Sequence, residues 1–478
     1  MISGSDLKCI HYIPFKILDY IELILCYFEA LYKGQARISL IILLRAGYIM
    51  KITFRLASSC VAAALLTVLT VDQSHAGAFG LREQSAIGQG VSFAGAAAGG
   101  AGLGSMFWNP AAMTDYKGIQ IEGTISGIFP FAKLTTDASS HVSPGKTSGD
   151  IAQDAVVPSA YGSWQAGQNI WFGLSVNAPY GLTTKYAPTW GTGLNYGSTT
   201  RVVSTEATPT IAYQINDQLS VGLGLRVMSF KAIYKSTIVT VGGLEGDSTG
   251  IGVSAGITYK PDNKTEVGIG YRSAVQQDMT GTYTSPLSGA LSPIKLRVML
   301  PDSISVGLKR KLTDQWTILA GYEWTNWSRI QFPVFYNQTT GVRIGALPLG
   351  YKDGWMVSGG LEYGLTPIWT LRSGVAYEYS PIRDNTRGAR LPDNDRIWLS
   401  LGSGYKYNQN LSFDISYSHI IPMGTRMDIV SGNPTYLPSL GPYIGSYTGK
   451  FNSHIDIISA SMRYRFDTPV APANLPKK

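Results

Sequence analysis

Cysteine is scarce in this sequence and unevenly placed. The 478 residues contain three cysteines, Cys9, Cys26 and Cys60, and all of them precede residue 61. Beyond about residue 77 the chain reads as short segments of alternating polarity. A protein that crosses an oxidising compartment before it folds is safer without stray thiols. Together, these two features favour a secreted bacterial β-barrel.

Charge and long hydrophobic runs are also scarce. Charged residues make up 15% of the chain, against about 25% in a typical soluble domain. The formal net charge is +8, but no run of Lys and Arg occurs, so we expect no nucleic-acid partner. After residue 76 no apolar run reaches the roughly 20 residues that a transmembrane helix needs. Membrane-spanning strands need only about 10 residues of alternating apolarity, and hydropathy does not reveal them.

Groups that carry catalysis or bind metals are equally few. Beyond residue 77 the histidines are His141, His419 and His454. No spacing pairs one of them with a serine as a hydrolase requires, and no cluster of Cys, His or acidic residues has the spacing of metal ligands. We therefore expect no enzymatic activity, no metal and no cofactor. No energy-coupling segment is present either, so any transport is expected to be passive.

Residues 50–76 have the three parts of a secretory signal peptide. Lys51 and Arg55 follow Met50, residues 61–69 form an apolar core, and 74–76 supply small residues for cleavage. A transmembrane helix is the alternative, but the uncharged stretch is too short for one. Because export signals begin at the start of a chain, residues 1–49 are predicted to be an over-long gene start.

Alternating polarity dominates the rest of the chain. Trp316, Ile318, Ala320, Tyr322 and Trp324 fall on one face of a strand, with polar or small residues between them. A period of two with one apolar face is typical of a half-buried strand. About fourteen such segments lie near 118–130, 156–165, 170–180, 200–213, 218–235, 249–260, 264–281, 294–311, 315–332, 353–363, 367–380, 394–407, 410–423 and 451–466.

The connections between these segments alternate strictly in length. Short turns lie at 166–169, 214–217, 261–263, 312–314, 364–366 and 408–409, and long loops lie near 131–155, 181–199, 236–248, 282–293, 333–352, 381–393 and 424–450. Outer-membrane barrels have tight periplasmic turns and long outer loops, whereas a soluble sandwich or propeller has no reason to alternate. The sequence therefore predicts an all-β fold, an antiparallel transmembrane barrel of about fourteen strands in the bacterial outer membrane.

Further features agree with a barrel. Trp316, Trp324, Trp369 and Tyr379 lie at strand ends, as in the interfacial aromatic girdles. The last strand ends at Phe466. In that strand the residues predicted to face lipid are Ile458, Ala460, Met462, Tyr464 and Phe466, and those predicted to face the lumen are Ser459, Ser461, Arg463 and Arg465. The terminal aromatic resembles the signal read by the barrel-assembly machinery. Residues 467–478 are expected to form a disordered periplasmic tail.

Residues 77–117 do not alternate. They are rich in Gly and Ala, and they also hold Phe79, Phe93, Phe107 and Trp108, which a flexible linker does not need. With a barrel following, the economical place for these small and apolar residues is the lumen. We therefore expect residues 77–117 to form a hatch that plugs the barrel formed by 118–466.

Several short motifs follow one another along the chain, namely Phe79-Gly80-Leu81-Arg82-Glu83, Asn109-Pro110-Ala111, Tyr180-Gly181-Leu182-Thr183-Thr184, Tyr271-Arg272-Ser273, Trp327-Ser328-Arg329, Tyr351-Lys352-Asp353 and 391–400. In these motifs and their order the chain resembles the FadL-type family of outer-membrane transporters for hydrophobic compounds, whose members carry long-chain fatty acids or aromatic hydrocarbons. The resemblance covers about 77–466. It implies fourteen strands, a hatch of short helices, an apolar pocket and a kinked third strand that opens the wall sideways.

Several residues acquire expected roles from the resemblance. The hatch and gating residues are Asn109, Pro110, Ala111, Gly173 and Pro179. Gly and Pro interrupt ladder pairing, so a kink in 170–179 is physically reasonable, although Pro179 could simply end the strand.

A fatty acid also needs a cation for its carboxylate, because a buried carboxylate without a partner is costly. Phe79, Lys231 and Lys352 match the family's ligand-binding positions. If neither lysine points inward, an uncharged hydrocarbon becomes the preferred cargo. Arg372, Glu378 and Arg396 are expected to brace the lumen, with Asn109, against the hatch.

The function that follows is passive uptake of hydrophobic molecules, first of all long-chain fatty acids, by binding in an apolar pocket and leaving sideways through the wall. Monoaromatic hydrocarbons are an alternative cargo, and an adhesin or structural barrel acting through its loops is an alternative function. Expected partners are a hydrophobic ligand, outer-membrane lipid and lipopolysaccharide, and the barrel-assembly machinery, with the chain as a monomer. A continuous apolar track from the loops to Phe79 would favour transport, whereas a salt-bridged interior would favour the adhesin.

Overall fold

The structure is a computed structural model that describes residues 78–140, 146–187, 190, 197–235, 243–285, 288–424, 426–436 and 446–466. The predicted gene start at 1–49, the signal peptide at 50–76 and the tail at 467–478 lie outside the described residues and stay predictions. Within the described ranges, no helix is both long and apolar enough to cross a membrane.

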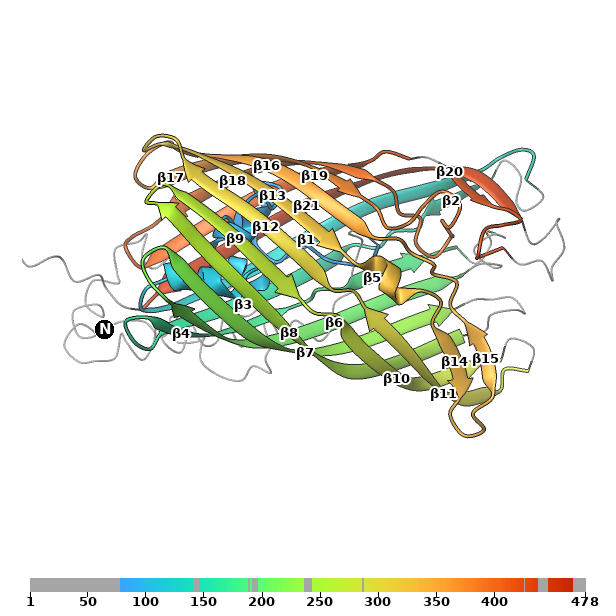
Figure 1. The fold of residues 1–478 in the computed structure, drawn as a ribbon. Coiled ribbons are helices and arrows are strands. Elements are labelled where there is room, and N and C mark those ends of the chain that lie inside the picture. Colours follow the sequence, from blue (N-terminus) through green and yellow to red (C-terminus); the bar gives the residue numbers. More distant parts are fainter. Residues whose placement is uncertain are drawn as a thin grey trace, which may run out of the picture. The chain divides into compact units, whose positions relative to one another are not determined.

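Fourteen antiparallel strands form the wall of a closed barrel in the described part of the chain (Figure 1). They are β1 (Ile119–Thr136), β3 (Ala155–Gln165), β4 with β5 (Ile170–Asn177 and Gly181–Lys185), β6 (Thr199–Gln214), β7 (Leu219–Lys235), β8 (Gly243–Asp262), β9 with β10 (Thr265–Arg272 and Val275–Thr284), β11 with β12 (Leu291–Leu300 and Ser303–Lys311), β13 (Trp316–Thr325), β16 (Gly354–Gly364), β17 (Trp369–Tyr379), β18 (Arg396–Lys406), β19 (Leu411–Pro422) and β21 (Tyr447–Arg465). The first and last strands pair from Gln120↔Arg465 to Thr136↔Gly449, which closes the wall.

Short turns join the strands at one end and long loops at the other, as the sequence predicts. The long loops carry the additional short elements β2 (Thr147–Asp150), η4 (Trp327–Ile330), β14 (Val334–Asn337), β15 (Arg343–Ala346) and β20 (Arg426–Ile429). Several wall strands run further into the loops than the sequence pattern indicates. Three of the predicted strands are interrupted and resume as a second segment, namely β4 with β5, β9 with β10 and β11 with β12.

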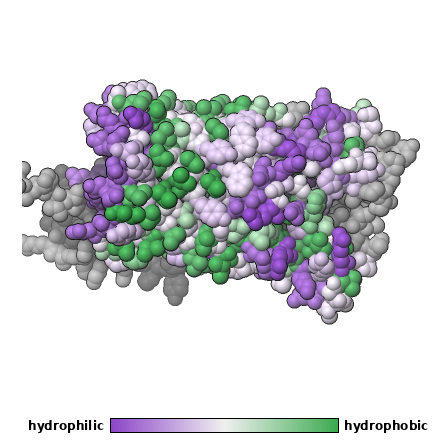
Figure 2. All heavy atoms as spheres, in the orientation of Figure 1, coloured by the Kyte–Doolittle hydropathy of each residue, from purple (hydrophilic) through white to green (hydrophobic). Residues whose placement is uncertain are grey.

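The alternation of side chains sets which face of the wall meets lipid. In β7, Leu223 and Leu225 are exposed on the outside, whereas Gly224 and Arg226, which alternate with them, are buried. The last strand follows its predicted phase, with Ile458 exposed and its neighbours buried. Figure 2 shows apolar side chains gathered over the middle of the wall and hydrophilic ones toward both ends. Such an apolar band is what the hydrocarbon layer requires.

Aromatic pairs lie where the predicted girdles should be. Trp316 packs against Tyr363 with ring centroids 4.6 Å apart, and Trp369 packs against Tyr405 at the same distance, both at the short-turn end. Toward the loop end, Trp355 stacks on Tyr379 at 5.2 Å. Aromatic rings at both interfaces anchor a barrel at its depth in the membrane.

Residues 78–117 fill part of the lumen with short helical turns (blue in Figure 1). These are α4 (Ala86–Gln89), η1 (Ala96–Ala98), η2 (Gly102–Phe107) and η3 (Pro110–Asp115). The segment is buried almost throughout, and it contacts wall strands on opposite sides, including β7 to β9 and β18, β19 and β21. Below, "hatch" denotes residues 78–117.

Candidate functional site

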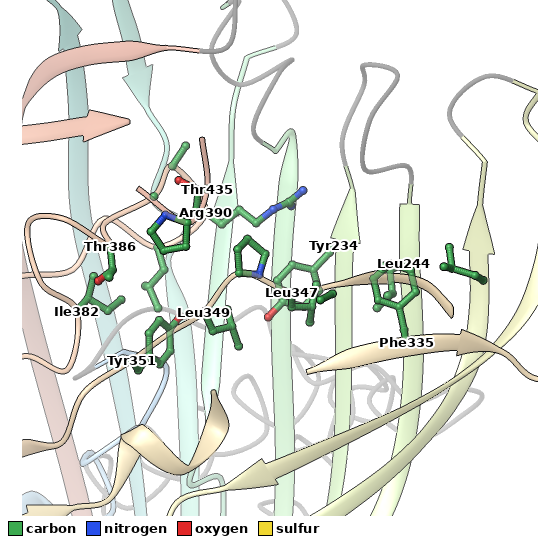
Figure 3. A pocket seen from close by; sticks show the side chains of 18 of the residues that line it. Tyr234, Leu244, Phe335, Leu347, Leu349, Tyr351, Ile382, Thr386, Arg390 and Thr435 are labelled. Atoms are coloured by element: carbon green, nitrogen blue, oxygen red, sulfur yellow. The ribbon is translucent and has the colours of Figure 1, made fainter. Parts of the chain in front are cut away.

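An apolar cavity opens at the loop end of the barrel. Its volume is about 320 Å³, which lies at the lower end of the roughly 300–1,000 Å³ of a typical small-molecule site. Its walls come from the ends of β7 and β8, from β10, β14 and β15, and from the loops that follow β15, β17 and β20. Figure 3 shows side chains from these segments converging on one space. The lining residues are Tyr234, Leu244, Tyr283, Phe335, Ile344, Gly345, Ala346, Leu347, Pro348, Leu349, Tyr351, Ile382, Thr386, Gly388, Ala389, Arg390, Leu391, Pro434 and Thr435.

Apolar packing continues from this cavity to Phe79. Tyr351, which lines the cavity, lies 6.2 Å from the ring of Trp327, and Trp327 lies 4.9 Å from Phe79. Phe79 in turn packs against Tyr180 at 5.8 Å and Phe230 at 6.4 Å. All five side chains belong to one buried apolar cluster. This is the continuous apolar track expected of a transporter, although salt bridges, which were expected of a loop-binding barrel, lie further down the same lumen.

The track ends where the third strand is broken. Asn177 pairs with Glu206 and Gly181 pairs with Val203, so residues 178–180 face only 204–205 of β6 and form a bulge. The strand therefore does not simply end at Pro179. On its other edge, pairing with β3 stops at Ala160↔Val176, and the next bridge in the described residues is Ala152↔Thr184, just before β3 begins.

The first residues of the hatch occupy that free edge. The amide of Leu81 donates to the carbonyl of Pro179 at 2.8 Å, and the amide of Gly181 donates to the carbonyl of Phe79 at 2.9 Å. Gly80 and Tyr180 are thereby bridged as antiparallel partners. These backbone bonds replace the ladder that β3 does not supply, so residues 79–81 cover a gap in the barrel wall.

Below the aromatic cluster, the lumen changes from apolar to charged. Arg226 and Arg272 both pair with Glu206, at 2.8 and 2.5 Å. Arg82 of the hatch pairs with Glu323 at 2.7 Å, and the indole of Trp108 donates to the same carboxylate at 3.0 Å. A small space under Trp327 is lined by four of these charged side chains. The charged lining at this depth of the lumen is therefore unfavourable for a long apolar molecule.

Asn109 ties the hatch to the wall. Its amide nitrogen donates to the carbonyl of Ala97 at 2.7 Å, to that of Ile257 at 3.0 Å and to the hydroxyl of Thr258 at 3.1 Å, while its oxygen accepts from the amide of Ala111 at 3.0 Å. Pro110 begins η3 directly after this cap. The Asn-Pro-Ala motif thus joins two turns of the hatch to β8.

We expect Asn109→Ala to loosen the hatch without unfolding the barrel. Buried partners left without a hydrogen bond cost about 2 kcal/mol in total, which corresponds to a roughly 30-fold rise in the open population. Amide hydrogen exchange of residues 86–115 should accelerate accordingly. Asn216→Ala is the matched control, because Asn216 accepts bonds only within an exposed turn. Unchanged exchange in the hatch of the Asn109 variant would contradict this role.

Gly173 also lies against the hatch. A Cβ placed on it would come within 2.5 Å of Cε of Met106 and 2.8 Å of Sδ of Met113. Glycine therefore allows two hatch methionines to pack directly on the third strand. The five predicted gating residues thus all lie in or against the hatch, and their part in opening stays a prediction.

The predicted lumen brace is divided between two networks. Glu378 does contact the hatch, through Arg82 at 3.4 Å, and it also pairs with Arg396 at 3.4 Å. Arg372 instead pairs with Glu362 at 2.8 Å and Asp414 at 2.7 Å, both on the wall. The expectation that Arg372 pairs with the hatch is therefore corrected: its carboxylate partners come from β16 and β19.

Neither predicted lysine lines the apolar cavity. Lys231 shares the outward phase of Leu223 and Leu225 on β7, is 51% exposed and pairs with Glu245 at 2.8 Å. Lys352 is exposed and lines a separate polar hollow beside Arg383. The expected inward placement of both lysines is thus corrected. Phe79 does lie in the apolar track, although Trp327 separates it from Tyr351 of the cavity lining.

The charged residue on the cavity wall is one that the sequence did not single out. Among the described lining residues, Arg390 alone carries a charge. Its position in a loop between β17 and β18 gave no periodic signal, and only the folded loops bring it to the cavity. In the described ranges, no group of three or more His, Cys and acidic residues could hold a metal ion.

Comparison with known proteins agrees with this architecture. The family described as outer membrane protein transport protein (OMPP1/FadL/TodX) matches residues 67–466. A "Long-chain fatty acid transport protein" of Salmonella typhi is 27% identical over 418 residues, which span 77% of this chain and 92% of the relative.

Two solved structures have the same fold. A Pseudomonas aeruginosa FadL homologue has a TM-score of 0.72 at 22% identity, over 82% of this chain and all of the homologue. The P. putida toluene transporter TodX has a TM-score of 0.60 at 18% identity, over 81% of this chain and all of that protein. The chain therefore belongs to the outer membrane protein transport family that includes FadL and TodX, and its barrel resides in the bacterial outer membrane.

Proposed function

We propose that this chain carries long-chain fatty acids passively across the outer membrane. The observation that supports the proposal best is the unbroken apolar track from the loop cavity to Phe79, at the break in the third strand. A long acyl chain needs such a track, because burying apolar surface is what holds it. The positions of Lys231 and Lys352 outside the cavity would by themselves favour an uncharged hydrocarbon, but the fatty-acid transport named for the Salmonella typhi relative supports the acid as the cargo.

Exit is sideways rather than straight through the barrel. Under Trp327 the lumen is lined by Arg82, Arg226, Arg272 and Glu323, and an acyl chain that displaced their partners would leave buried charges unpaired. Beside Phe79, by contrast, the gap between β3 and the third strand is closed by hatch residues 79–84. Residues 79–81 contribute backbone bonds, and Gln84 bonds to Ala178 of the third strand and to Ser159 and Tyr161 of β3. When this segment moves away, the cargo passes from the apolar cluster directly into the lipid.

Uptake by cells that lack their own transporter tests the proposal. The chain is expressed from Met50, and uptake of labelled oleate is compared with uptake of labelled toluene. We expect oleate uptake well above that of cells without the chain. Toluene uptake alone would move the cargo to aromatic hydrocarbons, which the aromatic lining by Tyr283, Phe335 and Tyr351 also suits. Uptake of neither, by an assembled barrel, would favour an adhesin.

A charge placed in the cavity tests whether the cavity is needed for transport by a barrel that has assembled. Leu347 lines the cavity and is 6% exposed. We expect Leu347→Asp to lower oleate uptake at least about tenfold, because an isolated carboxylate in apolar surroundings costs several kcal/mol and repels the cargo's own carboxylate. Leu312→Asp is the matched control, since Leu312 is 52% exposed in a short turn. Equal uptake by both variants would contradict the assignment of the cavity.

The partners of the barrel follow the same proposal. We propose that the chain acts as a monomer, since β1 pairs with β21 along its whole length and leaves no free edge between the described first and last strands. The exposed apolar wall contacts outer-membrane lipid and lipopolysaccharide. The last strand, ending near Phe466, is read by the barrel-assembly machinery.

A further inference from the structure

Among the described residues, Arg390 differs from the neighbouring arginines in having no acidic partner. Arg383, Arg387 and Arg396 each pair with an aspartate, at 3.5, 2.8 and 3.1 Å. One guanidinium nitrogen of Arg390, Nη1, donates only to neutral oxygens, the hydroxyl of Thr200 at 3.3 Å and the carbonyl of Lys235 at 3.2 Å. The other, Nη2, is buried and has no hydrogen-bond partner in the part of the chain that the structure describes.

The internal segments that the structure leaves undescribed cannot supply the missing acid. Residues 141–145, 188–189, 191–196, 236–242, 286–287, 425 and 437–445 contain neither Asp nor Glu. Burial lowers the pKa of Arg390 to about 10, so the guanidinium remains charged at neutral pH. An uncompensated cation in an apolar cavity is costly, and a ligand's anion would remove that cost.

The guanidinium is also held in place. It lies 5.5 Å from the ring centroid of Tyr234, which favours a cation through its π face. A Cβ added to Gly197 would lie 2.8 Å from Nη1 and 2.9 Å from Cζ, so glycine leaves just enough room for the charged group. Figure 3 shows Arg390 above Leu347 and Tyr234, on the side of the cavity toward the loops.

We propose that Arg390 binds the carboxylate of the fatty acid in the loop cavity and makes the chain select acids over esters and hydrocarbons. This inference rests on the proposed function. Nη2 donates to a carboxylate oxygen, and the acyl chain extends past Leu349 and Tyr351 toward Phe79. The cargo thus enters with its acid group toward the loops and its apolar end toward the broken strand. Arg390 takes the role that the resemblance would give to Lys231 or Lys352.

Binding of oleate and methyl oleate to the purified full-length barrel tests this. The two probes share their acyl chain, and only oleate carries a negative charge. We expect Arg390→Gln to weaken oleate binding by about ten- to hundredfold, the range for losing a hydrogen bond to a charged group, and to leave methyl oleate binding unchanged. Arg390→Lys should keep part of the preference for oleate, because it keeps the charge but loses the fork of donors.

Lys231→Gln and Lys352→Gln are the matched controls, because each removes a cation outside the cavity. Unchanged oleate binding in Arg390→Gln overturns the inference, and so does an equal loss of both probes, which would mean that Arg390 only holds the loop. A selective loss in Lys352→Gln instead would return the role to that lysine. If the native barrel binds neither probe, the proposed function itself fails. If the native barrel binds both probes equally, the proposed function stands and only the inference about Arg390 fails.

Discussion

A Gly80→Cys, Tyr180→Cys double variant is expected to take up oleate only after reduction. Residues 80 and 180 are antiparallel bridge partners, and the backbone bonds flank them rather than join them. Partners of this kind have Cα atoms about 4.5 Å apart, within the range that a disulfide spans. The oxidised bond ties the hatch segment to the third strand, so the gap in the wall stays covered and uptake falls to the level of cells without the barrel.

Comparing oxidised and reduced samples of the same double variant isolates the effect of the disulfide bond. The loss of the Tyr180 ring is common to both, and the single variants show its effect without a bond. The native chain has its three cysteines before residue 61, so no native thiol of residues 61–478 competes for pairing. If the oxidised variant transports oleate as fast as the reduced one, movement of residues 79–81 is not part of transport, and the cargo leaves by another route.

Most of the barrel wall can be predicted from the sequence, because the alternation of polar and apolar residues is a local signal. In a strand the side chains alternate between two faces. The apolar residues Ala320, Tyr322 and Trp324 therefore share the outer face, and Glu323 falls on the inner one. Short turns need few residues, and they mark the periplasmic end without any knowledge of tertiary contacts. The interruptions at Pro179 and at 273–274 were harder to place, because a strand that resumes after a bulge keeps its overall pattern.

The binding cavity could not be predicted from the sequence, because no local signal marks the residues that line it. Tyr234, Leu349, Arg390 and Thr435 come from distant parts of the chain and meet only when the long loops have folded. Loop conformation carries no periodic signal, so the family resemblance is the remaining source of a prediction, and it indicates Lys231 and Lys352. The alternation in β7 already assigns Lys231 to the outer face. At this position the alternation of side chains, which has a physical basis, contradicts the family resemblance.

The hatch depends on glycines of the inner wall, and Gly270→Val is expected to prevent it from seating. A Cβ on Gly270 of β9 would lie 1.8 Å from the carbonyl oxygen of Trp108 and 2.8 Å from its carbon. The clash is with hatch backbone, which Asn109 fixes to the next strand, so no side-chain rotation relieves it. Overpacking typically costs 1–3 kcal/mol, and we expect a loss of about 3 kcal/mol or more here.

Two measurements distinguish a displaced hatch from a barrel that fails to form. Gel mobility of the unheated protein reports whether the β-wall has closed, and entry of a small hydrophilic antibiotic reports whether the lumen is open. We expect Gly270→Val to form less folded barrel and to make the remainder leak. Gly359→Val is the matched control, since a Cβ on Gly359 of β16 meets nothing within 4 Å. A Gly270 variant as sealed as this control would mean that the hatch can shift inside the wall, and that its close fit is not what keeps the lumen shut.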